Sequence, residues 1–94
     1  IVAVMYETTS PAINPATGNL RNTAATSPAA NVEVQIVDEA TKTPMDLRTG
    51  QNSTTATVNA GLATLPFAAQ YIATGGAAGA GIVSTAVQYS VTFP

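Results

Sequence analysis

The last fourteen residues of the chain, from Gly81 to Pro94, limit its possible folds more than any other segment. After Gly81, apolar or β-branched residues fill the odd positions and small or polar residues fill the even ones. The odd positions hold Val83, Thr85, Val87, Tyr89, Val91 and Phe93. An alternation with period two is typical of a β-strand that has one apolar and one polar face. The sequence therefore predicts a strand from Val83 to the end, with these six side chains on one face.

Other segments show the same alternation. Strands are expected over residues 1–7, 31–38 and 65–71, and a weaker one over 54–58, which is rich in β-branched residues. In the segment 31–38 we expect Val32, Val34 and Ile36 to face inward, with Glu33 and Gln35 facing water. Because a proline cannot donate to a strand ladder, Pro66 is expected at a strand start or edge.

Turn-forming residues separate these strands. Residues 8–28 contain three prolines with Asn14 and Gly18, and the run Pro15–Gly18 favours a turn. A short ribbon is expected near 19–23, and Met45 and Leu47 are expected as apolar anchors under a loop. The small-residue run 75–81 predicts a flexible connector into the last strand. No segment has the pattern of an amphipathic helix, so we expect one all-β sandwich domain over residues 1–94.

Composition excludes several classes of partner. Only 9% of the residues are charged, the net charge is −2, and the three basic residues are dispersed. Such a chain cannot neutralise a phosphate backbone, so nucleic acid is not expected as a partner. No apolar run reaches the length of about 18 residues that a membrane helix needs, so no membrane insertion is expected. Cysteine is absent, so reinforcement of so small a domain is expected from association with other chains.

The chemistry-bearing residues do not predict an enzyme, a cofactor site or a metal site. Histidine and cysteine are both absent. Asp38 and Glu39 are adjacent, but we interpret them as solvated turn charges, because neighbours on an extended chain point to opposite sides. The run 75–81 lacks the Lys-Ser/Thr of a phosphate-binding loop, and no function is assigned to the sequon at Asn52.

All five aromatic residues fall on faces expected to point inward, or at a strand end. Phe67 and Tyr71 are interpreted as core residues, with Tyr6 on the inner face of the first strand. For Tyr89 and Phe93 we prefer another role, in which they line a groove that a further strand closes.

Three motifs, in order along the chain, resemble the chaperone–usher pilins. The segment 31–38 is similar to the family's Asn-Val-x-Val-Gln-Ile-x-Asp strand. Residues 65–75 are similar to the Ile-Pro-Phe-x-Ala-x-Tyr-x-Ala-Thr-Gly stretch of type 1-like major pilins. The glycine fourteenth from the end, followed by the alternating strand, resembles the family's terminal strand. The resemblance covers residues 27–94 and is looser before them.

The resemblance implies an immunoglobulin-like sandwich that lacks its final strand. A periplasmic chaperone first fills the gap, and the amino-terminal extension of the neighbouring subunit then replaces it, in assembly at an outer-membrane usher. This is strand addition to an open sheet edge. The groove residues carried over are Gly81, Val83, Val87, Tyr89, Val91 and Phe93. The implied function is that of a structural subunit of an extracellular fimbria, and the alternative is a minor or tip pilin that binds a host glycan or another surface.

The chain departs from the family pattern at two places. Family members usually have tyrosine next to last, where this chain has Phe93. The disulfide and the alternating extension near a pilin's amino terminus are not found in these residues, so the chain is expected to lack the first strands and the donor extension of the subunit.

Overall fold

The computed structural model describes all residues from Ile1 to Pro94 and contains strands and turns without helix. The strands are β1 (Ala3–Tyr6), β2 (Leu20–Arg21), β3 (Val32–Asp38), β4 (Thr43–Pro44), β5 (Phe67–Ala73) and β6 (Tyr89–Thr92). The all-β prediction is therefore confirmed. Every pairing between these strands is antiparallel.

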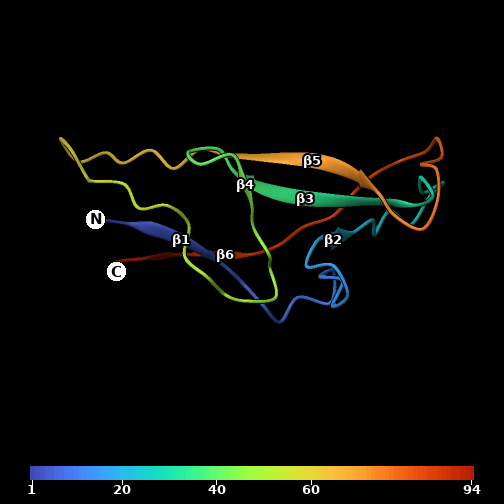
Figure 1. Ribbon diagram of the computed structural model, residues 1–94, viewed down its shortest axis with the longest axis horizontal. Coiled ribbons are helices and arrows are strands. Elements are labelled where there is room, and N and C mark those ends of the chain that lie inside the picture. The colour runs from blue at the N-terminus through green and yellow to red at the C-terminus, as the bar shows by residue number, and fades with distance from the viewer.

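The strands form two layers (Figure 1). In the first layer β3 is central: β5 pairs with its whole length, while the short strands β2 and β4 pair with its two ends. Since a strand has only two edges, β2 and β4 share the edge opposite β5. The second layer pairs β1 with β6, and isolated bridges from Val2 to Ala56 and from Met5 to Asn52 join residues 52–56 to the other edge of β1.

The expected strand over 54–58 is therefore wrong as a regular strand. Ala56 exchanges two backbone hydrogen bonds with Val2, both of 2.8 Å, and the neighbouring Ser53 side chain accepts a bond from the Val4 amide at 2.9 Å. Ser53 thus occupies the place of a backbone partner, so pairing of this segment with β1 is limited to isolated bridges.

The core lies between the layers and under the loops that follow β1 and β4. Its buried cluster consists of Ala12, Ile13, Leu20, Val34, Met45 and Leu47, with Tyr6, Ile36, Phe67, Val83 and Val87 packed against it. The expectation that Met45 and Leu47 anchor a loop is confirmed, since they are 4% and 2% exposed. The Tyr6 and Phe67 rings join the layers by an edge-to-face contact with centroids 5.5 Å apart.

Turns fall where the sequence predicts them. Gly18 closes the Pro15–Gly18 turn with φ of 77°, and its amide donates to the Asn14 carbonyl at 2.8 Å. Pro66 lies just before β5, as expected of a residue that cannot donate to a ladder.

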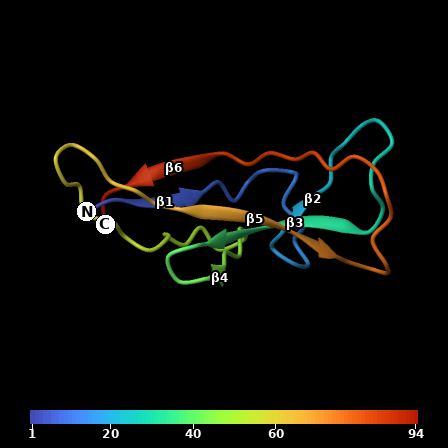
Figure 2. The same ribbon diagram turned by 90° about the horizontal axis from the view of Figure 1, so that it is seen from above.

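The molecule is elongated, with principal extents of 45 × 22 × 21 Å, and both termini lie at the same end (Figures 1 and 2). Its radius of gyration is 14.6 Å, whereas a compact chain of this length has a radius of about 12 Å. Only 16 of the 94 residues are buried. The core is therefore small for the surface that surrounds it.

We expect Leu47→Ala to lower the free energy of unfolding by about 2–5 kcal/mol, because it leaves a cavity in this small core. The control is Leu62→Ala, at a side chain that is 75% exposed, which should change the free energy by no more than about 0.5 kcal/mol. Urea unfolding followed by circular dichroism measures both variants. Equal losses in the two variants would contradict this assignment of the core.

Candidate functional site

The inner face of β6 is exposed to solvent. Tyr89 pairs with Tyr6 and Val91 with Val4, so these two β6 side chains share the face of β1 that looks toward β5. Val4 is only 6% exposed, whereas Tyr89 is 65% and Val91 is 52% exposed. Phe93, next on the same face, is 78% exposed. The inner face of this layer is thus covered at β1 and bare at β6.

The backbone of the same segment has hydrogen-bond partners on one side. Ile82 bonds to Ser27 and Ala29, and the carbonyls of Ser84 and Gln88 accept from Thr23 and Glu7. These are even-numbered residues, and successive residues of an extended chain direct their N–H and C=O groups to opposite edges. The odd-numbered residues therefore direct theirs away from β1, to an edge where no strand pairs with β6.

An apolar cavity of about 240 Å³ lies beside this edge. Its lining consists of Val4, Tyr6, Leu65, Phe67 and Tyr89, all hydrophobic, from both layers and the residues before β5. Burial raises the pKa of the Tyr6 hydroxyl, and the nearby Tyr89 and Asp38 raise it further, so the phenol stays neutral. A partly open cavity with hydrophobic side chains on all sides can accept an apolar side chain from a partner.

The first half of the terminal segment differs from the prediction. Regular strand is limited to Tyr89–Thr92, so a strand beginning at Val83 is wrong for this chain on its own. Residues 82–88 are held by loop residues 22–29 and by Glu7, which do not form a continuous ladder. Burial still alternates, because Val83, Thr85 and Val87 are half-buried between exposed neighbours.

Thr85 carries an unsatisfied polar group on this face. Its Oγ1 is buried and has no hydrogen-bond partner. A buried hydroxyl without a partner is destabilising by about 1–3 kcal/mol. A partner that supplied a backbone group here would remove that cost.

Gly81 is fixed against the loop that precedes β3. A Cβ at this position would lie 2.6 Å from the Ala29 nitrogen and 2.7 Å from the Ser27 oxygen. Its φ of 151° and this close approach both favour glycine. Gly81 thus places the start of the terminal segment and does not itself line the cavity.

Tyr71 is not a core residue, which corrects the sequence interpretation. It lies on β5 and is 72% exposed. β5 pairs with β3 on one edge and has no strand on the other, so nothing covers the middle of β5. Phe67 at the start of β5 does pack against the core, as predicted.

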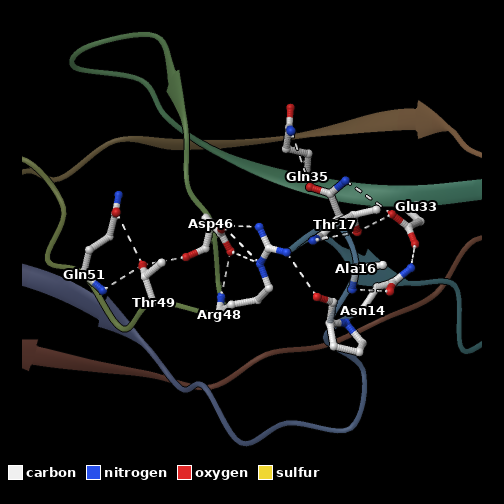
Figure 3. Close-up of polar contacts among 11 residues, drawn as sticks. Asn14, Ala16, Thr17, Glu33, Gln35, Asp46, Arg48, Thr49 and Gln51 are labelled. Atoms are coloured by element: carbon white, nitrogen blue, oxygen red, sulfur yellow. Dashed lines mark hydrogen bonds and ion pairs between the residues drawn. The ribbon is translucent and has the colours of Figure 1, made fainter.

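Glu33 is a second correction, because it is 5% exposed and does not face water. The loop after β1 covers it: Asn14, Thr17 and Asn19 donate side-chain hydrogen bonds to its carboxylate at 2.5–3.3 Å (Figure 3). Burial by itself would raise the pKa of Glu33. These three bonds and the charge of Arg21 outweigh burial, so the pKa lies below its ordinary value.

Asp38 is likewise buried and is not a solvated turn charge. Its carboxylate accepts from the amides of Ala40 at 3.1 Å and Thr54 at 2.8 Å, which ties the β3–β4 hairpin to the segment beside β1. Burial opposes ionisation, but these amides hold the pKa of Asp38 below its ordinary value. Glu39 points elsewhere and pairs with Lys42. The two acids therefore have separate partners and do not form a carboxylate pair.

Comparison with protein-family models, curated proteins and solved structures gave no match. No group of three or more acidic side chains is placed to hold a metal ion. None of the chain forms a helix of the length and apolar character needed to cross a membrane.

We expect Glu33→Gln to lower stability at neutral pH by about 1–2 kcal/mol, because a carboxylate that accepts three hydrogen bonds is lost. The folded-state pKa lies below the ordinary value of 4.5. The stabilisation by the carboxylate is therefore present above pH 4.5 and is lost as the pH falls through the lower folded-state value. The variant should lose less stability on acidification than the unaltered chain.

Urea unfolding at a series of pH values measures this difference. The control is Glu39→Gln, which removes an exposed ion pair with Lys42 and should alter stability by no more than about 0.5 kcal/mol. An unchanged acid dependence in Glu33→Gln would show that this cluster does not contribute to the pH dependence.

Proposed function

We propose that the chain is a structural subunit of a bacterial surface fimbria, and that a strand from a neighbouring subunit pairs with the open edge of β6. The observation that carries the proposal is the exposure of Tyr89, Val91 and Phe93 on the inner face of a sheet whose adjacent strand is buried. Large apolar side chains facing a core are normally covered. A strand from another chain, laid along β6, would cover them.

The hydrogen-bonding pattern supports a strand as the missing partner. The unpaired backbone groups of the odd residues repeat along residues 83–93, a length of about 36 Å in extended form. An extended peptide can pair with such an edge through main-chain bonds, and its alternate side chains then enter pockets on the inner face. The cavity lined by Tyr6, Phe67 and Tyr89 is such a pocket, and the buried Thr85 hydroxyl lacks a partner on the same face.

The proposed fold is an immunoglobulin-like sandwich that lacks its final strand, as the resemblance to chaperone–usher pilins implies. In that account a periplasmic chaperone supplies the strand first, and the next subunit supplies it during assembly at the outer-membrane usher. The mature protein is then extracellular, in a homopolymeric fibre. The open outer edge of β5 and the exposed Tyr71 support the further proposal that amino-terminal strands of the subunit complete the other layer.

A minor or tip subunit with an adhesive role remains the alternative proposal. The row of exposed apolar side chains at Tyr89, Val91 and Phe93 favours the structural role, because it follows the open edge of β6.

We expect a synthetic peptide of alternating apolar and polar residues to raise the urea midpoint of the chain. A peptide of the same composition without alternation is the control, since it cannot present its apolar side chains on one face. Without a peptide the chain should associate through its open edges. An unaltered chain that stays monomeric, and whose urea midpoint neither peptide changes, would contradict the proposal.

The side-chain contribution is tested in the same assay with Val91→Asp and Ser90→Asp. In the complex Val91→Asp would bury an unpaired carboxylate, so its peptide complex should be weaker by roughly 3 kcal/mol. Ser90 is exposed and lies on the opposite face of β6, so Ser90→Asp should weaken the complex by no more than about 0.5 kcal/mol. Equal effects in the two variants would show that the peptide does not cover the face of β6 that carries Val91.

A further inference from the structure

A surface pocket of about 520 Å³ lies among the residues that follow β1, the end of β2 and the loop after β4. It shares no residue with the open edge of β6. Its polar lining comes from Thr8, Ser10, Arg21 and Arg48, and its apolar lining includes Pro11 and Pro15. Two of the three basic side chains of the protein therefore meet in one pocket, and no carboxylate lines it.

Arg21 has hydrogen-bonding capacity left for a ligand. Its guanidinium donates one hydrogen bond within the chain, to the Pro11 carbonyl at 3.2 Å, and takes part in no ion pair. Glu33 lies opposite Arg21 in the β2–β3 pair, but its carboxylate accepts from three neutral side chains. The remaining N–H groups of Arg21 are thus available to an anion, and guanidinium binds a carboxylate through two parallel hydrogen bonds.

Arg48 has a different role in the pocket, because its guanidinium N–H groups already donate hydrogen bonds within the chain. Its Nε and Nη2 bond to the Asp46 carboxylate and its Nη1 donates to the Pro15 carbonyl at 3.1 Å (Figure 3). These bonds fix the loop after β4 against the Pro15–Gly18 turn. Arg48 therefore forms a rigid wall of the pocket, and Arg21 is the group that can close on a ligand.

We propose that this pocket binds an acidic sugar, with the sugar carboxylate on Arg21. The pocket is wide open to solvent, so a ligand would lie on the surface and would not be enclosed. The hydroxyls of Thr8 and Ser10 can bond to sugar hydroxyls, and the rings of Pro11 and Pro15 offer apolar surface to the C–H face of a sugar ring. A simple inorganic anion would use Arg21 alone and would leave the rest of this lining without a role.

The test is a chemical-shift titration of the isotopically labelled 94-residue chain with N-acetylneuraminic acid, in the presence of the alternating peptide that covers the open edge of β6. Its methyl ester, which has no charge, and inorganic sulfate are the comparison probes. We expect saturable shifts at residues 8–15 and 21 with the acid, and binding weaker by roughly tenfold or more with the ester, because a charged hydrogen-bonded pair is lost.

Arg21→Gln should weaken binding of the acid to the level of the ester. Arg21→Lys should retain part of the affinity, because it keeps the charge. The matched control is Lys42→Gln, which removes the same charge at the exposed partner of Glu39 and should leave binding unchanged. The spectrum away from the pocket shows whether each variant is folded.

Four outcomes would overturn the proposal. Equal binding of acid and ester would exclude recognition of the carboxylate. If Lys42→Gln weakened binding as much as Arg21→Gln, the effect would come from the net charge of the protein and not from this pocket. Sulfate that binds as tightly as the acid would leave a simple anion site without sugar recognition. Absence of a saturable shift at residues 8–15 and 21 would exclude the site.

Discussion

Pairing of backbone groups along the terminal segment is the constraint on which the rest of this structure depends. Each extended residue directs its N–H and C=O groups to one edge, so a segment that bonds through its even residues leaves the odd ones without partners. Ile82, Ser84 and Gln88 bond to the body of the chain, and β6 continues this pattern beside β1. Side chains follow the same period, so the unpaired edge and the uncovered apolar face belong to the same residues. One added strand would complete both.

The small size of the core also follows from unpaired strand edges. Both layers have an open edge, at β5 and at β6, and the largest fully buried side chains, Leu20 and Leu47, lie instead under the loops. Loop residues take over functions that strands usually have: Asn14, Thr17 and Asn19 cover Glu33, and Ser53 replaces a backbone partner of Val4. These polar contacts cover the chain at two places, while the apolar side chains of Tyr89 and Val91 stay exposed.

Much of the fold could be predicted from period-two patterning, because β3, β5 and the paired part of β1 and β6 follow it. The wrong predictions of burial concern residues whose cover depends on segments that are distant in the sequence. Glu33 alternates like a solvent-facing residue, yet a loop about fifteen residues earlier covers it, and only the asparagines of that loop hinted at donors. Tyr71 alternates like a core residue, yet no strand covers it. The pocket at Arg21 and Arg48 joins residues 27 positions apart, which no local pattern reveals.

Amide hydrogen exchange, residue by residue along 82–93, tests the central claim most directly. In the free chain, diluted until it is monomeric, the amides of Ile82 and Ser84, which donate to Ser27 and Asn22, should exchange slowly relative to those of Tyr89 and Val91. On addition of the alternating peptide, the amides of Tyr89 and Val91 should become protected, because their N–H groups gain a partner strand. Protection of these two amides in the free chain, or none after the peptide binds, would contradict the account.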